Sequence, residues 1–477
     1  MGASGPRARR RGIVLVGVAL GLLVACTGTS DPSASDGGAT EPAAAEDALV
    51  RQGGEATVLE DGASAFAQPM PGLSSQERRD FAVGNSFFNQ NWVTAPASTE
   101  ARDGLGPLFN AASCSSCHFK DGRGQPPVDA DDPERGLLVR LSVLDDDGSS
   151  LPHPTYGGQF QDRAIRGVPE EGAIRIDIEE QPGAYADGTA YSLAAPTYTL
   201  VTPDGTEITD IVVSPRVAPA MLGVGLLENV PQAVVEERAD PDDADGDGVS
   251  GRPHLVEDPD TGETVLGRFG WKAAVPTLQD QNAAAFANDI GITSSVVPEQ
   301  PCTDAQPECS AAPDGGTPEL DDEKLETITF YTRTLAVPAR RDVGGGDTTA
   351  GQELFDQIGC ASCHAAELTT GPSDLAPLAN QTIRPYTDLL LHDMGPALSD
   401  ERPDGDAAGA EWRTPPLWGI GLVETVNRHT RFLHDGRARS IEEAILWHGG
   451  EGEASKVRFT DLPADDRAAI LTFLESL

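Results

Sequence analysis

Two hydrophobic patterns alternate along this chain. Between residues 120 and 215, stretches such as RGLLVRLSVL (135–144) and GAIRIDIEE (172–180) are rich in Val, Ile and Leu between Gly and Pro breaks, which predicts strands. Residues 320–335 and 463–477 are amphipathic with acidic first turns, which predicts helices because the helix dipole favours carboxylates there. Ser440 and Glu443 form a capping-box signal for another helix, which would carry His448 near its end.

Four landmarks recur in one order and predict an internal duplication. The paired segments are 114–118 with 360–364, 219–228 with 415–424, 268–273 with 431–438, and 320–335 with 463–477. In the second pair, PAMLGVGLLE and PPLWGIGLVE are identical at five of ten positions. We therefore predict two related, mainly α domains over residues 73–336 and 349–477, joined by a linker at 337–348. The strand-rich stretches read as a β-containing insertion in the first domain.

The first pair of landmarks is Cys-x-x-Cys-His, which has a specific chemical use. Two thiols three positions apart on a helical turn can add to the two vinyl groups of one haem, and the following histidine then binds the iron. The residues concerned are Cys114, Cys117 and His118 for one haem, and Cys360, Cys363 and His364 for a second. A single motif also fits a thiol-redox or zinc site, but two in a duplicated frame favour two covalently bound haem c groups.

The first residues predict export. RARRR (7–11) is followed by an uncharged apolar run, Ile13–Ala25, whose thirteen residues are too short to cross a membrane as a helix, so residues 1–25 read as a signal peptide. The run ends in LVAC, which resembles a bacterial lipobox, so we expect a lipid on Cys26 that anchors the mature protein to a membrane. The alternative is an ordinary signal peptide with an incidental cysteine. Residues 27–72 are predicted to form a disordered acidic tether, with folded sequence beginning by about Leu73.

Charge and cysteine count add two further limits. The chain has 34 Lys and Arg against 76 Asp and Glu, a net charge of −42, so it repels phosphate backbones and we expect no nucleic-acid partner. After the haem motifs and Cys26 are assigned, two of the seven cysteines remain, Cys302 and Cys309. A close pair in an exported protein predicts a local disulfide.

The ligand on the far side of each iron decides between electron transfer and chemistry on a small molecule. His448 is the best candidate for the second haem, although a histidine at a helix end also fits an exposed position. Met394 is the rival ligand, although most methionines pack in a core. An alignment that needs a two-residue gap places Ala285 where His448 stands, which would leave the first haem with an open face.

Two polar residues follow from this alignment. Gln281 and Asp289 lie on or just after the helix that contains Ala285 and are candidates for proton handling in catalysis. The alternative is that both are exposed polar residues without a role in catalysis.

A separate signal is DADGDGVSG (243–251), which resembles a calcium loop. Its expected ligands are Asp243, Asp245, Asp247 and the carbonyl of Val249. His254 stands where the bidentate Glu of a full EF-hand would be, so a solvated acidic turn is the alternative.

These motifs together resemble a known family, the bacterial di-haem c-type oxidoreductases related to di-haem cytochrome c peroxidases, and within it a branch described as di-haem peroxidases or thiol-oxidoreductase-like proteins. The matching stretches are GNSFFNQNWVTAPASTEARDGLGPLFNAASCSSCH, DADGDGVSGRP, GRFGWKA, YTDLLLHDMGPAL, RTPPLWGIGL and FLHDGRARSIEEAILWHGGE. The resemblance implies two cytochrome-c-like helical domains, often with calcium between them. It also implies that one haem collects electrons while the other reduces hydrogen peroxide.

The chain departs from that family pattern in two places. The relatives have Met or Tyr where this chain has His448, and peroxidases carry a displaceable histidine soon after the first motif, whereas none occurs here before His153. Our leading hypothesis is an exported, lipid-anchored di-haem enzyme that reacts with peroxide or another small oxidant at the haem of His118. A small redox protein, a cytochrome or a cupredoxin, would supply the other haem with electrons. The alternatives are a non-catalytic electron carrier and, less directly, a partner in metal acquisition or cofactor maturation.

Overall fold

The computed structural model describes residues 41–127 and 136–477. The predicted signal peptide, Cys26 and the first part of the predicted tether lie outside these residues. Residues 44–477 form one compact unit, and the fold described here is that unit.

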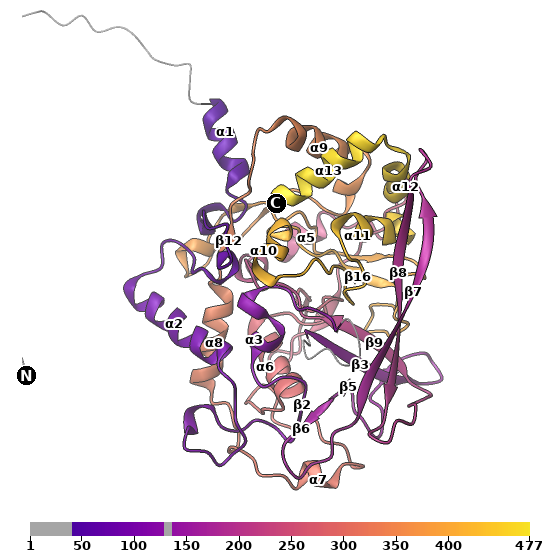
Figure 1. The fold of residues 1–477 in the computed structure, drawn as a ribbon. Coiled ribbons are helices and arrows are strands. Elements are labelled where there is room, and N and C mark those ends of the chain that lie inside the picture. Colours follow the sequence, from indigo (N-terminus) through magenta and orange to yellow (C-terminus); the bar gives the residue numbers. More distant parts are fainter. Residues whose placement is uncertain (1–40, 128–135) are drawn as a thin grey trace, which may run out of the picture. The chain divides into compact units, whose positions relative to one another are not determined.

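Helices are distributed along the whole described chain (Figure 1). The α-helices are α1 (Glu41–Val50), α2 (Ser75–Asn89), α3 (Cys114–Cys117), α4 (Val224–Glu228), α5 (Gln232–Glu236), α6 (Leu278–Ala285), α7 (Pro307–Ser310), α8 (Asp322–Arg333), α9 (Gly346–Gln357), α10 (Val423–Asn427), α11 (Ile441–Trp447), α12 (Glu453–Asp461) and α13 (Ala464–Ser476). Shorter turns are η1 (Gly54–Ala56), η2 (Ala65–Ala67), η3 (Glu100–Arg102), η4 (Phe119–Asp121), η5 (Phe286–Ile290), η6 (Cys360–Ser362), η7 (Ala376–Leu378), η8 (Ile420–Leu422) and η9 (Gly450–Gly452).

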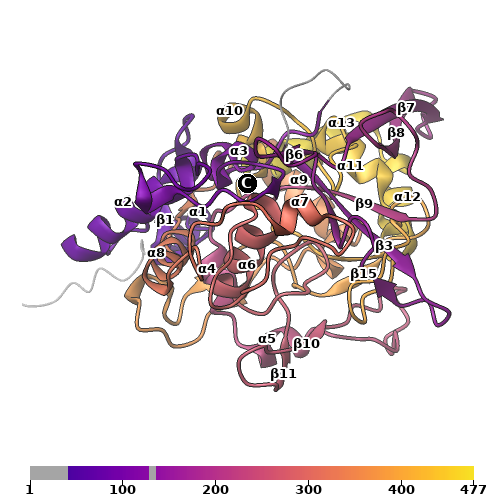
Figure 2. The same ribbon diagram turned by 90° about the horizontal axis from the view of Figure 1, so that it is seen from below.

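The strands form one four-stranded sheet and several two-stranded pairs. The strands are β1 (Thr57–Val58), β2 (Leu108–Phe109), β3 (Leu137–Leu144), β4 (Ser150–Leu151), β5 (Gln159–Phe160), β6 (Arg163–Ala164), β7 (Ala173–Ala184), β8 (Ala190–Val201), β9 (Val212–Val217), β10 (Leu255–Glu257), β11 (Thr264–Leu266), β12 (Val337–Pro338), β13 (Leu368–Thr369), β14 (Thr382–Ile383), β15 (Leu391–Asp393) and β16 (Glu411–Arg413). In the four-stranded sheet, β3 pairs with β4, β5 and β9. Most other pairs are antiparallel, such as β10–β11, which lies near α5 in Figure 2.

The expectation of a mainly α fold built from two cytochrome-c-like domains is wrong. Helices account for 31% of the chain and strands for 19%, and the strands form many small antiparallel sheets. The predicted strands are present as β3 and β7, but short pairs such as β13–β14 and β15–β16 also occur where only helices were expected. These pairs involve two or three residues each, too few for hydrophobic alternation to reveal them. The domain boundaries at 73–336, 337–348 and 349–477 stay a prediction.

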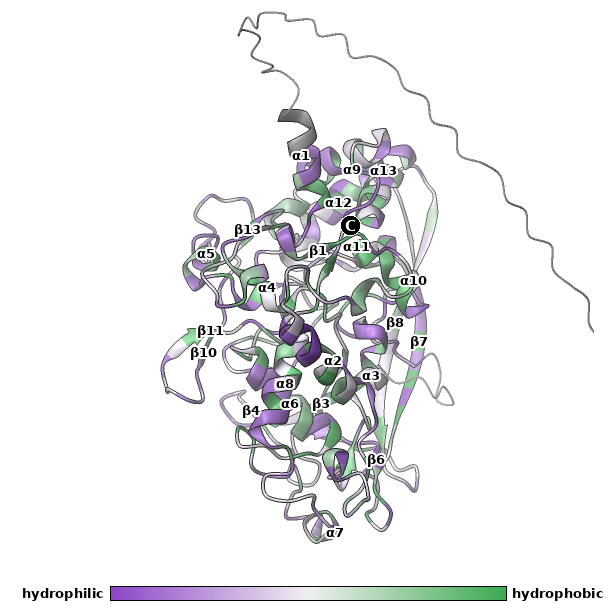
Figure 3. Cartoon of the chain, turned by 90° about the vertical axis from the view of Figure 1, so that its left-hand side faces the viewer, coloured by the Kyte–Doolittle hydropathy of each residue, from purple (hydrophilic) through white to green (hydrophobic). Residues whose placement is uncertain are grey.

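Two helix pairs stand next to the haem motifs, α2 with α8 and α9 with α13. The predicted helices 320–335 and 463–477 are confirmed as α8 and α13, and α8 is capped by Asp321, whose side chain accepts a hydrogen bond from the backbone of Lys324. Figure 3 shows both polar and apolar positions along α8, as expected for a helix with one buried face.

A glycine lies at the crossing of each pair. A Cβ atom on Gly84 would lie 2.5 Å from the carbonyl oxygen of Thr327, and one on Gly351 would lie 1.9 Å from that of Ala469. The two backbones can therefore approach this closely only without a side chain at these positions.

Residues well before the first Cys-x-x-Cys-His motif also belong to the hydrophobic core. Ala56, Phe66 and Met70 are buried in one cluster with Trp418, and β1 pairs in parallel with β12. Folded structure therefore begins before Leu73, and residues of the predicted linker take part in it. Among the described residues, no helix is long and apolar enough to cross a membrane.

Among the described residues, the β7–β8 hairpin is the longest strand pair, and it contacts the later helices α11 and α13. Its strands pair over twelve residues and run beside α11 and α12 in Figure 1. The hydroxyl of Tyr185 donates to Glu442 at 2.7 Å, and the backbone N–H of Ala194 donates to Glu443 at 2.6 Å. At the turn, Arg467 of α13 pairs with Asp187 at 2.9 Å. The hairpin thus holds the helix that precedes His448.

The predicted local disulfide is confirmed. Cys302 and Cys309 are bonded to each other across the start of α7.

Candidate functional site

Each Cys-x-x-Cys-His segment folds as a single helical turn. The backbone N–H of His118 bonds to the carbonyl of Cys114 at 2.9 Å, and that of His364 bonds to Cys360 at 3.0 Å. Such a turn presents both thiols and the histidine toward one side. Burial raises the pKa of Cys114 and of Cys360 to about 12.

The two motif histidines are oriented in the same way. His118 Nδ1 lies 2.7 Å from the carbonyl oxygen of Pro219, and His364 Nδ1 lies 3.0 Å from that of Tyr386. Burial lowers the pKa of each imidazole to about 4, so both are neutral and donate from Nδ1. The lone pair then lies on Nε2, which is the arrangement of an iron-binding histidine.

One cavity reaches both motifs. Its volume is about 670 Å³, and its wall includes Cys114, His118, Cys360 and His364. Among the described residues, the one group of three or more side chains placed to share a metal ion is acidic and lies elsewhere, so neither motif has the four ligands of a structural zinc site. The donors, the orientation of the histidines and the cavity therefore fit haem.

His448 faces His364 across this cavity. The two ring centroids are 6.5 Å apart, and His448 Nδ1 bonds to the carbonyl of Ala444 at 2.7 Å, which leaves its Nε2 available. Two imidazoles that bind one ion from opposite sides at about 2 Å place their centroids roughly 6 to 6.5 Å apart. Burial lowers the pKa of His448 as well, so the ring is neutral. This geometry supports His448 as the second ligand of that haem.

Helix α11 and its cap position His448. Ser440 caps α11 by accepting from the backbone of Glu443 at 3.0 Å. The side chain of Glu443 does not complete the capping box among the described contacts and accepts instead from Ala194 and Arg439. His448 follows Trp447 directly at the helix end and lines the cavity.

The rival ligands are less well placed. Met394 lines the same cavity but packs with Leu398, Val423 and Trp447 in an apolar cluster. His392 has both ring nitrogens engaged, with Glu451 at 2.6 Å and Asp388 at 2.9 Å. Burial alone would lower the pKa of His392, but the hydrogen bonds to these carboxylates and to Cys363 raise it to about 12, so it is an imidazolium.

The corresponding position in the first half is Ala285. Thr277 caps α6 by accepting from the backbone of Asp280, as Ser440 does for α11, and each cap lies nine residues after its arginine, Arg268 or Arg431. Counting from the caps pairs Ala285 with His448 without the two-residue gap that the sequence alignment required. Ala285 lines the cavity and brings no ligand atom to it.

Gln281 and Asp289 are both on the cavity wall near Ala285. Gln281 Oε1 is buried and has no hydrogen-bond partner among the described residues. Asp289 accepts from Gln159 at 2.8 Å. Burial raises the pKa of Asp289 to about 6, against the opposing hydrogen bond from Gln159 and the charge of Arg140. A carboxyl with this pKa can take up and release a proton near neutral pH.

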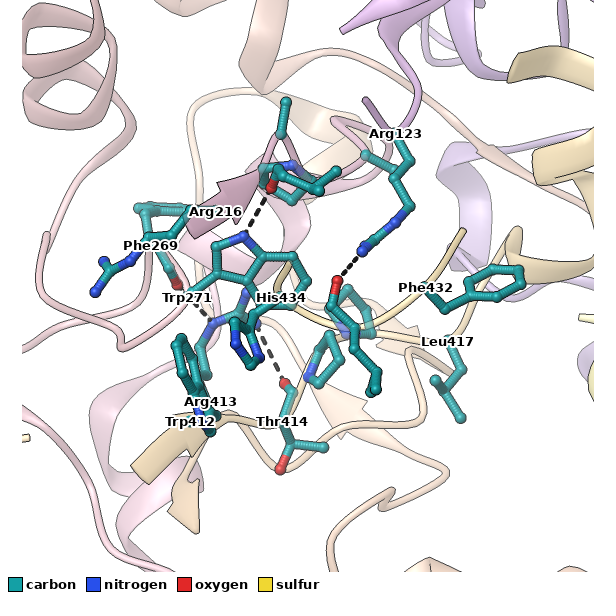
Figure 4. A pocket seen from close by; sticks show the side chains of 18 of the residues that line it. Arg123, Arg216, Phe269, Trp271, Trp412, Arg413, Thr414, Leu417, Phe432 and His434 are labelled. Carbon is teal, nitrogen blue, oxygen red and sulfur yellow. Dashed lines mark hydrogen bonds between the residues drawn. The ribbon is translucent and has the colours of Figure 1, made fainter. Parts of the chain in front are cut away.

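A group of aromatic side chains lies on the cavity wall (Figure 4). His434 stacks on Trp412 with centroids 3.8 Å apart, and Trp271 stands edge-on at 6.5 Å. The ammonium group of Lys272 lies 4.4 Å from the Trp412 ring centroid. Hydrophobic periodicity did not single these residues out; the one signal was that Trp271 and His434 occupy equal positions after Arg268 and Arg431.

The calcium-like loop gathers a partly different set of carboxylates from the one expected. Asp240, Asp243 and Asp245 each offer an oxygen within 4.8 Å of the others, whereas Asp247 accepts from the hydroxyl of Ser362 in the second motif at 3.4 Å. Asp240 was missed because it precedes the repeating Asp-x-Asp pattern.

The loop is also connected to the second motif through Glu451. Ser250 donates to Glu451 from its backbone and its hydroxyl, at 2.9 and 3.0 Å, and Glu451 holds His392, which contacts Cys363 Sγ at 3.6 Å. These contacts connect the conformation of the loop to the surroundings of Cys363 in the second motif.

Two haem-type motifs that share one cavity define a protein that binds two haem groups for redox chemistry. The sequence matches the family described as "Di-haem oxidoreductase, putative peroxidase" over residues 47–147 and 184–477. The chain belongs to this family, and it is an oxidoreductase. Residues 148–183, including most of β7, lie outside the match. A comparison with curated proteins found no match.

Proposed function

We propose that this protein is a di-haem c-type enzyme that reduces a small oxidant, such as hydrogen peroxide, beside His118 and receives its electrons beside His364. Cys114 with Cys117 and Cys360 with Cys363 would each hold one haem by thioether bonds. A haem iron supplies one-electron chemistry and, where one axial position is open, a binding site for peroxide. Reduction of one hydrogen peroxide consumes two electrons and two protons and gives two water molecules.

The observation that carries this proposal is the difference between the two halves. His364 has His448 opposite it at 6.5 Å between ring centroids, whereas Ala285 stands at the matching position of the first half. An iron with two histidine ligands favours electron transfer, and an iron with one favours a reacting ligand.

Gln281 and Asp289 would serve the open side. The carboxylate of Asp289 can accept a proton from bound peroxide and return it to the departing oxygen, which is general acid–base catalysis. The unpartnered Oε1 of Gln281 can accept a hydrogen bond from the same oxidant. Both roles require only side chains that already line the cavity.

The location and the electron donor rest on the sequence. We propose that residues 1–25 direct export, that Cys26 carries the lipid anchor, and that a small cytochrome or cupredoxin delivers the electrons. Mass spectrometry of the envelope fraction tests the anchor, because a mature chain that begins elsewhere than at a lipidated Cys26 would contradict it.

We further propose that the loop around Asp243 binds calcium with Asp245 and the neighbouring oxygens of Asp247 and Val249. Asp240 is added to this set by the structure. Calorimetric titration of Ca²⁺ should show one site that is weakened at least about tenfold in Asp243→Asn, because a carboxylate ligand is lost. Unchanged heats on titration would count against the site, and Asp258→Asn, in another turn, is the control.

Electron paramagnetic resonance of the oxidised protein tests the main proposal. One high-spin and one low-spin ferric signal are expected, with peroxide altering only the high-spin one. Two low-spin signals that peroxide and half-reduction leave unchanged would instead support the electron carrier.

A further inference from the structure

Four arginines on the cavity wall form no ion pair within the described parts of the chain: Arg123, Arg140, Arg268 and Arg413. Two of them, Arg268 and Arg413, lie near each other, because the carbonyl of Gly270, two residues after Arg268, accepts from Arg413 Nε at 3.3 Å. Arg413 is 8% exposed. Neither guanidinium forms an ion pair within the described parts of the chain, and both carry positive charge in a protein of net charge −42.

Their hydrogen bonds go to backbone carbonyls alone. Arg268 donates to Leu266 at 3.1 Å and to Val230 at 2.7 Å, and its Nε is buried without a partner. The second bond of Arg413, to the carbonyl of Thr414, is also long at 3.3 Å. Figure 4 shows Arg413 beside Trp412 and His434 on the cavity wall.

The carboxylates that act electrostatically on these two arginines are already engaged by other side chains. Glu228, which acts on Arg268, is held by Arg333 at 3.0 Å, and Asp388, which acts on Arg413, is held by His392 at 2.9 Å. Burial lowers the pKa of Arg413 to about 10, against the opposing charge of Asp388.

A third donor points to the same kind of ligand. The indole N–H of Trp418 is buried, lines the cavity and has no hydrogen-bond partner among the described residues. A buried unpaired cation or N–H donor costs free energy that an anionic acceptor would recover. Arg268, Arg413 and Trp418 therefore present two cations and two N–H donors without a described partner to whatever fills the cavity.

We propose that Arg268, Arg413 and Trp418 bind propionate carboxylates of the haem groups. Each haem brings two carboxylates, which accept hydrogen bonds and cannot donate them when ionised, and arginine is suited to this geometry. The inference rests on haem binding in this cavity, and it does not depend on which oxidant is reduced.

The test is spectroelectrochemical titration of the holoprotein, combined with resonance Raman spectra of the propionate bending modes. Loss of a cation beside a propionate disfavours reduction, so Arg268→Gln and Arg413→Gln should each lower the reduction equilibrium constant of one haem about tenfold, or about 59 mV. Arg413→Lys keeps the charge and should retain most of the potential, which also covers the case in which Arg413→Gln does not fold. Trp418→Phe should shift the propionate bands with a smaller change in potential.

Matched controls lie outside the cavity. Arg467→Gln removes a buried arginine that is paired with Asp187, and Trp447→Phe removes another buried indole N–H without a described partner. Neither should change the potentials or the propionate bands. If the cavity variants behave like these controls while retaining both haems, the proposal is overturned and the arginines face a diffusible anion or none. Failure of peroxide reduction in the wild type would reject the proposed function and leave this result standing.

Discussion

The two haem motifs are alike on one side and different on the other. His118 and His364 are each fixed by a hydrogen bond from Nδ1 to a backbone carbonyl, at 2.7 and 3.0 Å. At matching positions of the two halves the chain has Ala285 in one case and His448 in the other, and only His448 has a described ring contact with its motif histidine. Under the proposed function the motifs hold the two haems alike, and a residue on a distant helix decides whether each iron can react.

The largest expected effect comes from removing this difference. Ala285→His should close the first iron under the proposed function, because it puts a histidine on the cavity wall at the position that matches His448. We expect loss of the high-spin signal and a fall in peroxide reduction of about 1000-fold, equal to about 4 kcal/mol in activation free energy. Stopped-flow kinetics measures it, and Ala284→Ser on the same helix is the control. Retained activity with a retained high-spin signal would show that Ala285 does not face the reactive iron.

The pH dependence of peroxide reduction tests the proposed role of Asp289 in the first half. Because burial raises its folded pKa to about 6, the carboxylate form that accepts a proton is present above that pH and is lost as the pH falls through 6. Asp289→Asn should lower peroxide reduction about 100-fold and remove this acidic limb from the pH–rate profile. Asp280→Asn, earlier on the same helix and bonded to Thr277, should keep the limb. A wild-type profile in Asp289→Asn would remove Asp289 from catalysis.

His448→Ala tests the other half. The low-spin signal of the second haem should become high-spin, and turnover with a protein donor should fall about tenfold because electron entry slows while the first haem is intact. Met394→Leu should leave both signals unchanged. A spectral change in Met394→Leu with none in His448→Ala would reverse our choice of ligand.

The smallest expected effect concerns the support behind His448. Tyr185→Phe removes the 2.7 Å hydrogen bond to Glu442 and should lower the free energy of unfolding by about 1 kcal/mol, measured by denaturant titration. Ser192→Ala, on the same hairpin, removes a hydroxyl that donates to the exposed Glu180 and should cost less than about 0.5 kcal/mol. Equal losses would show that the contact to α11 has no special weight.

Sequence reasoning recovered the parts of the site that depend on local spacing. The Cys-x-x-Cys-His residues, the cap at Ser440, the helices α8 and α13 and the Cys302–Cys309 disulfide all follow from residues close to one another in the chain. His448 could be proposed because it lies at a fixed distance from its cap. Ala285 was also placed from the sequence, with a two-residue gap that the caps of α6 and α11 show to be unnecessary.

The rest depends on contacts across long separations. The mainly α expectation was wrong because pairs such as β15 with β16 form between two short segments, each defined only by the other. Arg268 and Arg413 carry no periodic signal, and their importance appears only when the neighbouring carboxylates are seen to be occupied. The engagement of His392 by Asp388 and Glu451, which removes it as an iron ligand, is of the same kind.

The β7–β8 hairpin has a consequence for any attempt to study the second half alone. Glu443, three residues after the cap Ser440 and five before His448, accepts a hydrogen bond from the backbone of Ala194, and a chain beginning at residue 349 would lack that contact. Under the proposed function, the second haem would then receive its ligand His448 from a helix that lacks one of its supporting contacts. Ligation of that iron would therefore depend on two segments far apart in the sequence. Helix α11 carries His448, and the β7–β8 hairpin supports this helix.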